Sequence, residues 1–343
     1  MELLGLSPEL LALFVSFGFM VGVFFGFFGM GGSFLVTPAL LILGYPAPVA
    51  IGSSMAFVFG TAVIATLKHH DVGQVDYKLG ALMFVGIVLG IEAGKMLVFG
   101  LEAIGQAELV VGIAYILLLG AIGIVFTRNA LKQDETADNA EDDNQHTDDD
   151  IPDIAKKIKS YNIPPMVTLT DGSKASMWTI SGVGGGVGVV SGFLGVGGGF
   201  IRMPAIYYLI GVPLAAAVGT SLFGALMSGA VGAFSYGLSG VIDLGVVTAL
   251  LVGSALGARI GSASTAYVDE NDVTIYFGIM LLLASAAVAF GEFANWFEMP
   301  ILDTVSFVLL IGSSFFVTTI IIYYGALAVR ERKATADLTS SHG

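Results

Sequence analysis

The sequence contains no cysteine, which excludes disulfide frameworks, thiol chemistry and thiolate metal sites. Charge is also scarce: Asp, Glu, Lys and Arg make up 12% of the 343 residues, against the roughly 25% typical of soluble domains. The four histidines form no HExxH pattern, and the sequence has no metal-ligand cluster and no carboxylate box. We therefore expect no bound metal, no cofactor and no enzymatic activity.

Apolar residues are abundant, at 55% of the chain, and the mean hydropathy is +0.87. Runs of about 20 apolar residues match a bilayer core about 30 Å thick. Such runs lie near 8–28, 48–67, 78–100, 107–127, 177–198, 214–236, 244–263, 273–292 and 301–328. The first run lacks the basic flank of a signal peptide, so we interpret it as a retained helix. The sequence predicts an all-α polytopic protein, which we place in the plasma membrane.

The net charge of −13 is concentrated in one segment. Residues 134–153 hold ten acids and no Lys or Arg, and without them 17 acids face 14 bases. An acidic run of this kind is solvated and typical of disorder. We expect residues 129–173 to form a disordered cytoplasmic linker.

The two sides of this linker repeat one another. An offset of 166 residues places Gly18, Gly22 and Gly26 on Gly184, Gly188 and Gly192, and GFFGMGGSFLVTP (26–38) on GFLGVGGGFIRMP (192–204). After one inserted residue, an offset of 167 places GSS (52–54) on GTS (219–221), Asp76 on Asp243, and Gly86, Gly90 and Gly94 on Gly253, Gly257 and Gly261. The chain is two copies of one unit of about four helical elements, 8–128 and 174–292, with an extra C-terminal helix at 301–328.

The orientation follows from Lys and Arg, which favour cytoplasmic loops. Basic residues flank the linker, lie in the 68–78 loop and form RERK at 330–333. All three segments can be cytoplasmic only if each glycine-rich element and its short return segment cross the membrane an even number of times, or not at all. The halves then have inverted topology, with the N-terminus outside. A single crossing would make the repeats parallel and put the basic linker outside, which the charges disfavour.

Interrupted helices in inverted repeats are typical of secondary transporters. Unwound backbone is tolerated within a membrane only if it is buried or lines a wet cavity, and its free amides favour an anion. The predicted backbone ligands are Gly29, Gly31, Gly32, Gly195, Gly197 and Gly198. Tight helix packing is the alternative role for these loops. Neither loop has the P-loop or dinucleotide-binding pattern.

Polar side chains near the two loops are the other candidate ligands. Ser53, Ser54, Thr220 and Ser221 either donate to an oxyanion or bond back to their own helices. Arg202 follows the second loop, and its counterpart in the first half is Val36. It is either an anion ligand or an anchor at the membrane interface.

Charges within the apolar runs are costly and tend to be functional or paired. Glu92 and Arg259 occupy equivalent positions with opposite charge, so they form an ion pair or a substrate or proton-coupling site. Lys95 can pair with Glu92 or extend to the interface. Asp76 and Asp243 are predicted N-caps. The glycines spaced by four residues are predicted to serve helix packing.

The paired GxxGxGG…P loops, the GSS and GTS elements that follow them, and the two-unit layout resemble the sulfite exporter TauE/SafE family of membrane proteins. The likeness covers about 8–128 and 174–328. It departs at Ser33, where the second loop has Gly199, and at the long acidic linker. The resemblance implies export of sulfite, sulfoacetate or related organosulfur anions.

We therefore expect a secondary transporter, an exporter of small anions. The alternatives are an anion channel or a non-transporting membrane scaffold, and an intramembrane enzyme. The expected partners are a small anionic substrate and the lipid bilayer, with no nucleic acid. The exact substrate, the direction, the coupling ion and the oligomeric state are left open by the sequence.

Overall fold

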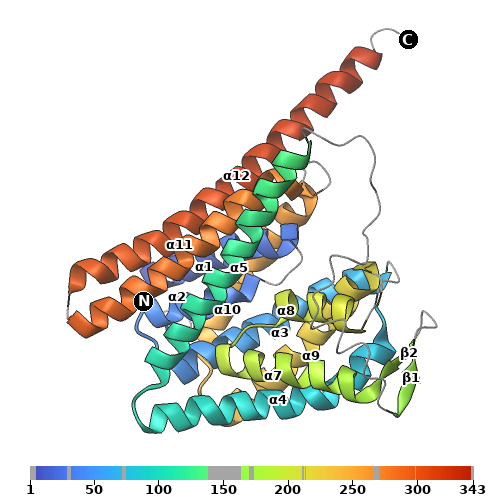
Figure 1. Cartoon of the computed structure of the whole chain (residues 1–343). Helices are drawn as coiled ribbons and strands as arrows, with labels where there is room; N and C mark the ends of the chain where they lie inside the picture. The colour runs from blue at the N-terminus through green and yellow to red at the C-terminus, as the bar shows by residue number, and fades with distance from the viewer. Residues whose placement is uncertain are drawn as a thin grey trace. The chain divides into compact units, whose positions relative to one another are not determined.

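The computed structural model describes residues 5–28, 32–71, 75–137, 164–169, 174–210, 212, 214–265, 270–297 and 299–340. The first half comprises α1 (Pro8–Phe28), η1 (Gly32–Leu35), α2 (Val36–Ile42), α3 (Ala47–Asp71), α4 (Tyr77–Ala103) and α5 (Ala107–Ala137). The second half comprises α7 (Met177–Leu194), α8 (Gly199–Ala205), the π-helical turn η3 (Ile206–Ile210), α9 (Leu214–Leu238), α10 (Leu244–Ser264) and α11 (Glu270–Phe297), and α12 (Pro300–Ser340) ends the chain (Figure 1).

Within these ranges, nine helices are long and apolar enough to cross a membrane, and they coincide with the nine predicted runs. They lie in α1, α3, α4, α5, α7, α9, α10, α11 and α12. Their outward faces carry large apolar side chains, for example Leu89 at 67% and Leu117 at 68% exposure. Such surfaces suit lipid, and helices satisfy their own backbone hydrogen bonds there. The prediction of an all-α polytopic membrane protein is confirmed.

The ends of the predicted linker are more structured than expected. Helix α5 continues past residue 128 to Ala137, through RNALKQDETA, which is rich in good helix formers. At the other end, β1 (Met166–Thr168) pairs antiparallel with β2 (Lys174–Ser176). Residues 138–163, which contain most of the acidic run, lie outside the described residues.

The helices form two packing units that cut across the sequence repeats. The first unit contains α1, η1, α2, α5 from Gly112 onward, α10 from Thr248 onward, α11 and α12. The second contains α3, α4, the hairpin, α7, α8, η3, α9 and the first residues of α5 and α10. Each unit therefore combines helices of both halves. A sequence repeat is therefore not a packing unit, because the core of each unit is built from helices of both repeats.

In the second unit, α4 and α7 lie side by side and run parallel (Figure 1). The glycines of α4 face carbonyl oxygens of α7 in register: Gly86 opposite Ser181, Gly90 opposite Gly185, and Gly94 opposite Val189. A Cβ at any of the three glycines would overlap the facing backbone. Only glycine therefore allows the two helices to approach so closely.

The first unit contains the equivalent contact between α1 and α10. Here Gly253 lies opposite Val15, Gly257 opposite Phe19, and Gly261 opposite Val23. Each of these pairs is the repeat equivalent of an α4–α7 pair. For example, Gly253 corresponds to Gly86, and Val15 corresponds to Ser181. The prediction that the glycine ladders serve packing is confirmed in both units.

Equivalent helices of the two halves run antiparallel within each unit. In the second unit, Met55 and Phe59 of α3 lie against Gly232 and Gly229 of α9, so one helix ascends as the other descends. In the first unit, α5 and α11 are antiparallel in the same way, with Gly112 against Glu292 and Thr127 against Gly278. Within each unit, these two pairs of repeat-equivalent helices therefore run in opposite directions.

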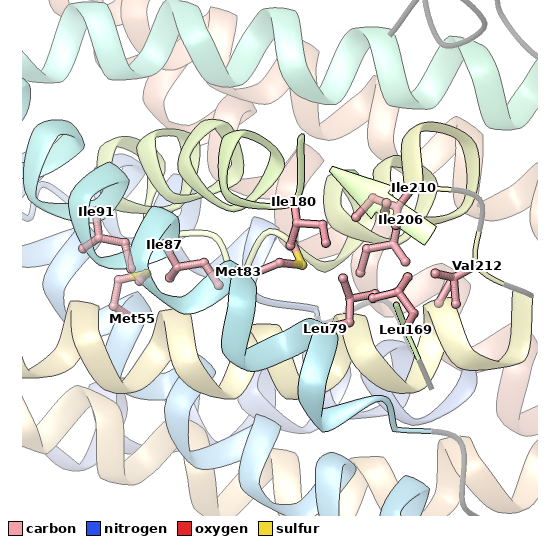
Figure 2. Close-up of a cluster of buried hydrophobic side chains, with 12 residues drawn as sticks. Met55, Leu79, Met83, Ile87, Ile91, Leu169, Ile180, Ile206, Ile210 and Val212 are labelled. Atoms are coloured by element: carbon pink, nitrogen blue, oxygen red, sulfur yellow. The ribbon is translucent and has the colours of Figure 1, made fainter. Parts of the chain in front are cut away.

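A buried apolar cluster in the second unit fixes the segment that carries the candidate site (Figure 2). It is built around one face of α4 and includes residues from α3, α7, η3 and the hairpin: Met55, Leu79, Met83, Ile87, Ile91, Leu169, Ala175, Ile180, Ile206, Ile210, Val212 and Ala217. Because η3 directly follows α8, the packing of Ile206 and Ile210 in this cluster fixes the C-terminal end of α8.

Candidate anion-binding site

The second glycine-rich stretch interrupts the chain between α7 and α8. Helix α7 ends at Leu194 and is capped by Gly195, with φ +73°, and α8 begins after its N-cap Gly198, with φ +71°. Both values lie in the left-handed region that favours glycine. The predicted interruption is therefore present in the second half. In the first half, α1 ends at Phe28 and η1 begins at Gly32, while Gly29 and Gly31 lie outside the described residues.

Gly197 lies where α3 and α9 meet. A Cβ there would be 2.9 Å from Cγ1 of Val58 and 3.6 Å from Cβ of Ala225. The Gly197 carbonyl accepts a hydrogen bond from Nη1 of Arg202 at 3.2 Å. This glycine therefore supports both packing and the placement of the arginine.

Arg202, in α8, is completely buried, with 0% exposure. Its Nη1 also donates to the Ser221 carbonyl at 3.1 Å, and its Nη2 donates to Ser228 Oγ at 2.5 Å. Its Nε has no hydrogen-bond acceptor, and no carboxylate of the described residues stands against the guanidinium. Since an interface anchor must reach the lipid headgroups, the anchor interpretation of Arg202 is wrong.

Helix α9 provides the slot that receives this arginine. Ser221, Gly224 and Ser228 are spaced by three and four residues, so they share one face of the helix. A Cβ at Gly224 would lie 2.6 Å from Cδ and 2.8 Å from Nε of Arg202. The bare backbone at Gly224 therefore lets the guanidinium lie directly against α9.

Ser191, in the last turn of α7, approaches the same place from the other side. It is buried, and its hydroxyl has no hydrogen-bond partner among the residues that the structure describes. The point where a Cβ would stand on Gly198 is 2.8 Å from Ser191 Oγ and 3.4 Å from Nη2 of Arg202. Ser191, Gly224 and Ser228 were not predicted as site residues. The signal that could have found them is the contrast with their first-half counterparts Phe25, Phe57 and Thr61.

Two of the predicted hydroxyl ligands, Ser53 and Thr220, accept hydrogen bonds from the opposite half. Ser53 Oγ accepts from the Asp243 amide at 3.0 Å, and Thr220 Oγ1 accepts from the Asp76 amide at 2.9 Å. Ser221 Oγ donates to the Gly199 carbonyl of α8 at 3.1 Å. These bonds differ from the expected alternative, in which each hydroxyl bonds back to its own helix. Ser54 is also buried in α3.

Both predicted N-caps are confirmed. The Asp76 carboxylate accepts from the Leu79 amide at 2.9 Å and caps α4. The Asp243 carboxylate accepts from the Val246 amide at 3.0 Å at the start of α10. Each aspartate therefore fixes a helix start through its carboxylate while its own amide bonds to the opposite half.

The charged residues within the spans have different surroundings. Glu92 is half-buried on α4 in the second unit, whereas Arg259 is exposed on α10 in the first unit. Their pairing stays a prediction. Lys95 Nζ donates to the carbonyl and hydroxyl of Ser235 at 2.6 and 3.0 Å and lies 5.6 Å from the ring centroid of Phe99. Lys95 thus ties α4 to α9.

Comparison with known proteins agrees with this architecture. A family model described as sulfite exporter TauE/SafE matches residues 14–288. A probable membrane transporter protein of Xylella fastidiosa is 27% identical over 63% of this chain and 70% of its own length. One of Methanocaldococcus jannaschii is 27% identical over 62% of this chain and 67% of its own. YunE, a probable membrane transporter protein of Bacillus subtilis, is 23% identical over 62% and 72%.

No solved structure matches the chain. The family match, however, includes both glycine-rich stretches, eight of the nine candidate spans in whole or in part, and Arg202. The relatives with similar sequences are all named as membrane transporters. The protein belongs to the sulfite exporter TauE/SafE family of membrane transporters.

Proposed function

We propose that this protein is a secondary transporter that exports small oxyanions, with sulfite and organosulfur anions such as sulfoacetate as substrates, across the plasma membrane. The observation that carries the proposal is Arg202. It is a fully buried cation beside a broken helix, without a carboxylate partner among the described residues.

A buried charge without a counter-ion is costly, because desolvation is not offset by an attractive partner. Residues of this kind in membrane proteins tend to belong to substrate pathways. The Arg202 contacts leave its Nε without an acceptor, and Nε shares an edge of the guanidinium with Nη2. Such an edge can donate two parallel hydrogen bonds to an oxyanion. An anionic substrate would supply the missing charge.

The remaining proposed ligands are backbone and hydroxyl donors of both halves. They are Gly29, Gly31 and Gly32, Gly195, Gly197 and Gly198, and the hydroxyls of Ser53, Ser54, Thr220 and Ser221. A hydroxyl that accepts one hydrogen bond can still donate another, so the bonds of Ser53 and Thr220 to backbone amides are compatible with this role. Glu92 and Arg259 are proposed to pair or to couple transport to a second ion.

We propose further that the halves have inverted topology, with the N-terminus outside and the linker and C-terminus inside. The antiparallel packing of α3 with α9 and of α5 with α11 supports this, because all four are candidate spans and each pair consists of repeat equivalents. The parallel packing of α4 with α7 agrees with the same topology, since both would begin at the cytoplasmic side. Inverted repeats allow alternating access to a site that the two halves share.

The test is flux into proteoliposomes that contain the purified full-length protein, with sulfite, sulfate, thiosulfate and an alkyl sulfonate offered in turn. A carrier gives saturable uptake that is accelerated by the same anion on the opposite side. Uptake that rises linearly with concentration identifies a channel. The absence of flux for every anion in the panel contradicts the proposal.

A further inference from the structure

Buried polar atoms without a partner are rare, because each one costs free energy. In the described part of the chain they are Thr66 Oγ1, Thr127 Oγ1, Ser191 Oγ and Arg202 Nε. Two of these four, Ser191 Oγ and Arg202 Nε, belong to residues that flank Gly198. Such clustering on both sides of one glycine indicates a shared ligand.

We infer that Ser191 is a second ligand of the transported anion, and that Ser191 and Arg202 together form the side-chain donor pair of one oxyanion site per chain, a pair that the second half alone carries. This inference rests on the proposed function. Gly198 brings the two residues together, because its missing side chain allows α7 and α8 to meet around it. The Ser191 hydroxyl can donate to one oxygen of the anion while the Nε–Nη2 edge of Arg202 donates to others.

Two neighbouring residues hold the arginine in place for this task. Ser228 Oγ accepts from Nη2, and the carbonyls of Gly197 and Ser221 both accept from Nη1. Gly224 leaves room for the guanidinium plane. With Nη1 bound to two carbonyls and Nη2 to Ser228, Nε is the guanidinium nitrogen whose donor remains for a ligand among the described residues. Ser228 and Gly224 are therefore positioning residues.

The first half cannot offer the same site. The residues equivalent to Ser191, Arg202 and Gly224 are Phe25, Val36 and Phe57. None of these side chains has a hydrogen-bond donor, and Val36 and Phe57 are buried. Thr61, the equivalent of Ser228, donates within its own helix to the carbonyls of Phe57 and Val58. The two halves share a repeat sequence, but only the second half carries Ser191 and Arg202 as hydrogen-bond donors.

This donor set fits the head of a compact oxyanion. A planar fork and a hydroxyl from a different helix reach oxygens in different directions, as the three oxygens of sulfite or of a sulfonate head group require. Sulfite itself is the suitable probe because it has no organic part that could bind elsewhere.

The experiment is calorimetric titration of sulfite into the full-length protein in detergent, with wild type, Ser191→Ala and the matched control Ser314→Ala. Ser314 is an equally buried serine of α12 whose hydroxyl bonds back to Leu310. We expect wild type to bind one sulfite per chain. We expect Ser191→Ala to weaken binding about 10-fold or more, as the loss of a hydrogen bond to a charged group does, and Ser314→Ala to bind as wild type.

Thermal unfolding of the same variants provides the second measurement. Because the Ser191 hydroxyl has no partner within the described part of the chain, Ser191→Ala should unfold at the wild-type temperature or higher without sulfite. It should gain less stability than wild type from added sulfite. If Ser191→Ala fails to fold, or binds sulfite as tightly as wild type, the inference is overturned while the proposed function stands. Two sulfites per chain overturn the one-site assignment. A wild-type protein that does not bind sulfite overturns the inference, and one that also transports none of the anions of the flux panel overturns the proposed function itself.

Discussion

The backbone amide of Asp243 donates a hydrogen bond to Ser53 Oγ at 3.0 Å. The equivalent residues of the opposite halves form an equivalent bond: the Asp76 amide donates to Thr220 Oγ1 at 2.9 Å. Each residue is displaced by the offset of 167 that aligns the repeats. A two-fold axis produces reciprocal contacts of this kind, in which each residue of one half meets the equivalent of its partner in the other half. Within the second unit, the repeats therefore meet through a reciprocal contact.

These two bonds should contribute similar amounts to stability. Ser53→Ala and Thr220→Val each leave an aspartate amide without its acceptor, which costs about 1–3 kcal/mol for a buried group. Thr220→Ser keeps the hydroxyl and should retain most of that stability. The measurement is denaturant or thermal unfolding in detergent. Wild-type stability for both Ser53→Ala and Thr220→Val would show that the reciprocal bonds are incidental.

The glycine ladders should respond to a single methyl group. Gly90→Ala puts a Cβ into the Gly185 carbonyl, so α4 and α7 must separate and the protein should lose stability. Gly182→Ala is the matched control on α7, because its Cβ meets nothing within 4 Å. It should be neutral or stabilising by up to about 1 kcal/mol through helix propensity. Equal unfolding temperatures for the two variants would contradict the close-packing account.

Gly224 should be required for the anion site. Gly224→Ala places a methyl group 2.6 Å from Arg202 Cδ, so the guanidinium must move away from α9. We expect sulfite affinity to fall by about 10-fold or more, the order lost with a charge-assisted hydrogen bond. Gly237→Ala, at the end of the same helix, is the control, since its nearest contact is Cδ1 of Ile242 at 3.4 Å. Unchanged affinity in Gly224→Ala would mean that the arginine does not act from this slot.

The proposed topology can be tested by labelling, because the chain has no cysteine of its own. A cysteine introduced at Asn139 in the linker should be protected from an impermeant thiol reagent added outside intact cells. A cysteine at Ser7, before α1, should react. Labelling of the linker cysteine from outside would contradict the inverted topology, even though α3 packs antiparallel to α9 and α5 packs antiparallel to α11.

Much of the fold could be predicted from the sequence, because the repeat offset is nearly constant. The nine spans follow from apolar runs, and the ladders follow from Gly86, Gly90 and Gly94 recurring at Gly253, Gly257 and Gly261. The helix caps at Asp76 and Asp243 follow from residue type and position. All of these depend on local sequence or on its periodicity.

The exchange of helices between the halves could not be predicted in this way. Periodicity gives each helix a packing face, but it does not say whether α4 meets α1 or α7. The site has the same character: Ser191, Arg202 and Gly224 come from three helices and meet only in the folded second unit. Position-by-position contrast between the halves, such as Phe57 against Gly224, is the sequence signal that points there.

The central claim is that Arg202 is the charge that binds the transported anion. The most direct measurement compares sulfite flux in proteoliposomes and thermal unfolding for wild type, Arg202→Lys and Arg202→Met. Methionine keeps the apolar stem of arginine and removes the buried charge, and the unfolding measurement establishes that Arg202→Met is folded before its flux is compared. The account predicts no sulfite flux for Arg202→Met and weakened affinity for Arg202→Lys, which keeps the charge without the planar fork. Wild-type sulfite flux in Arg202→Met would contradict it.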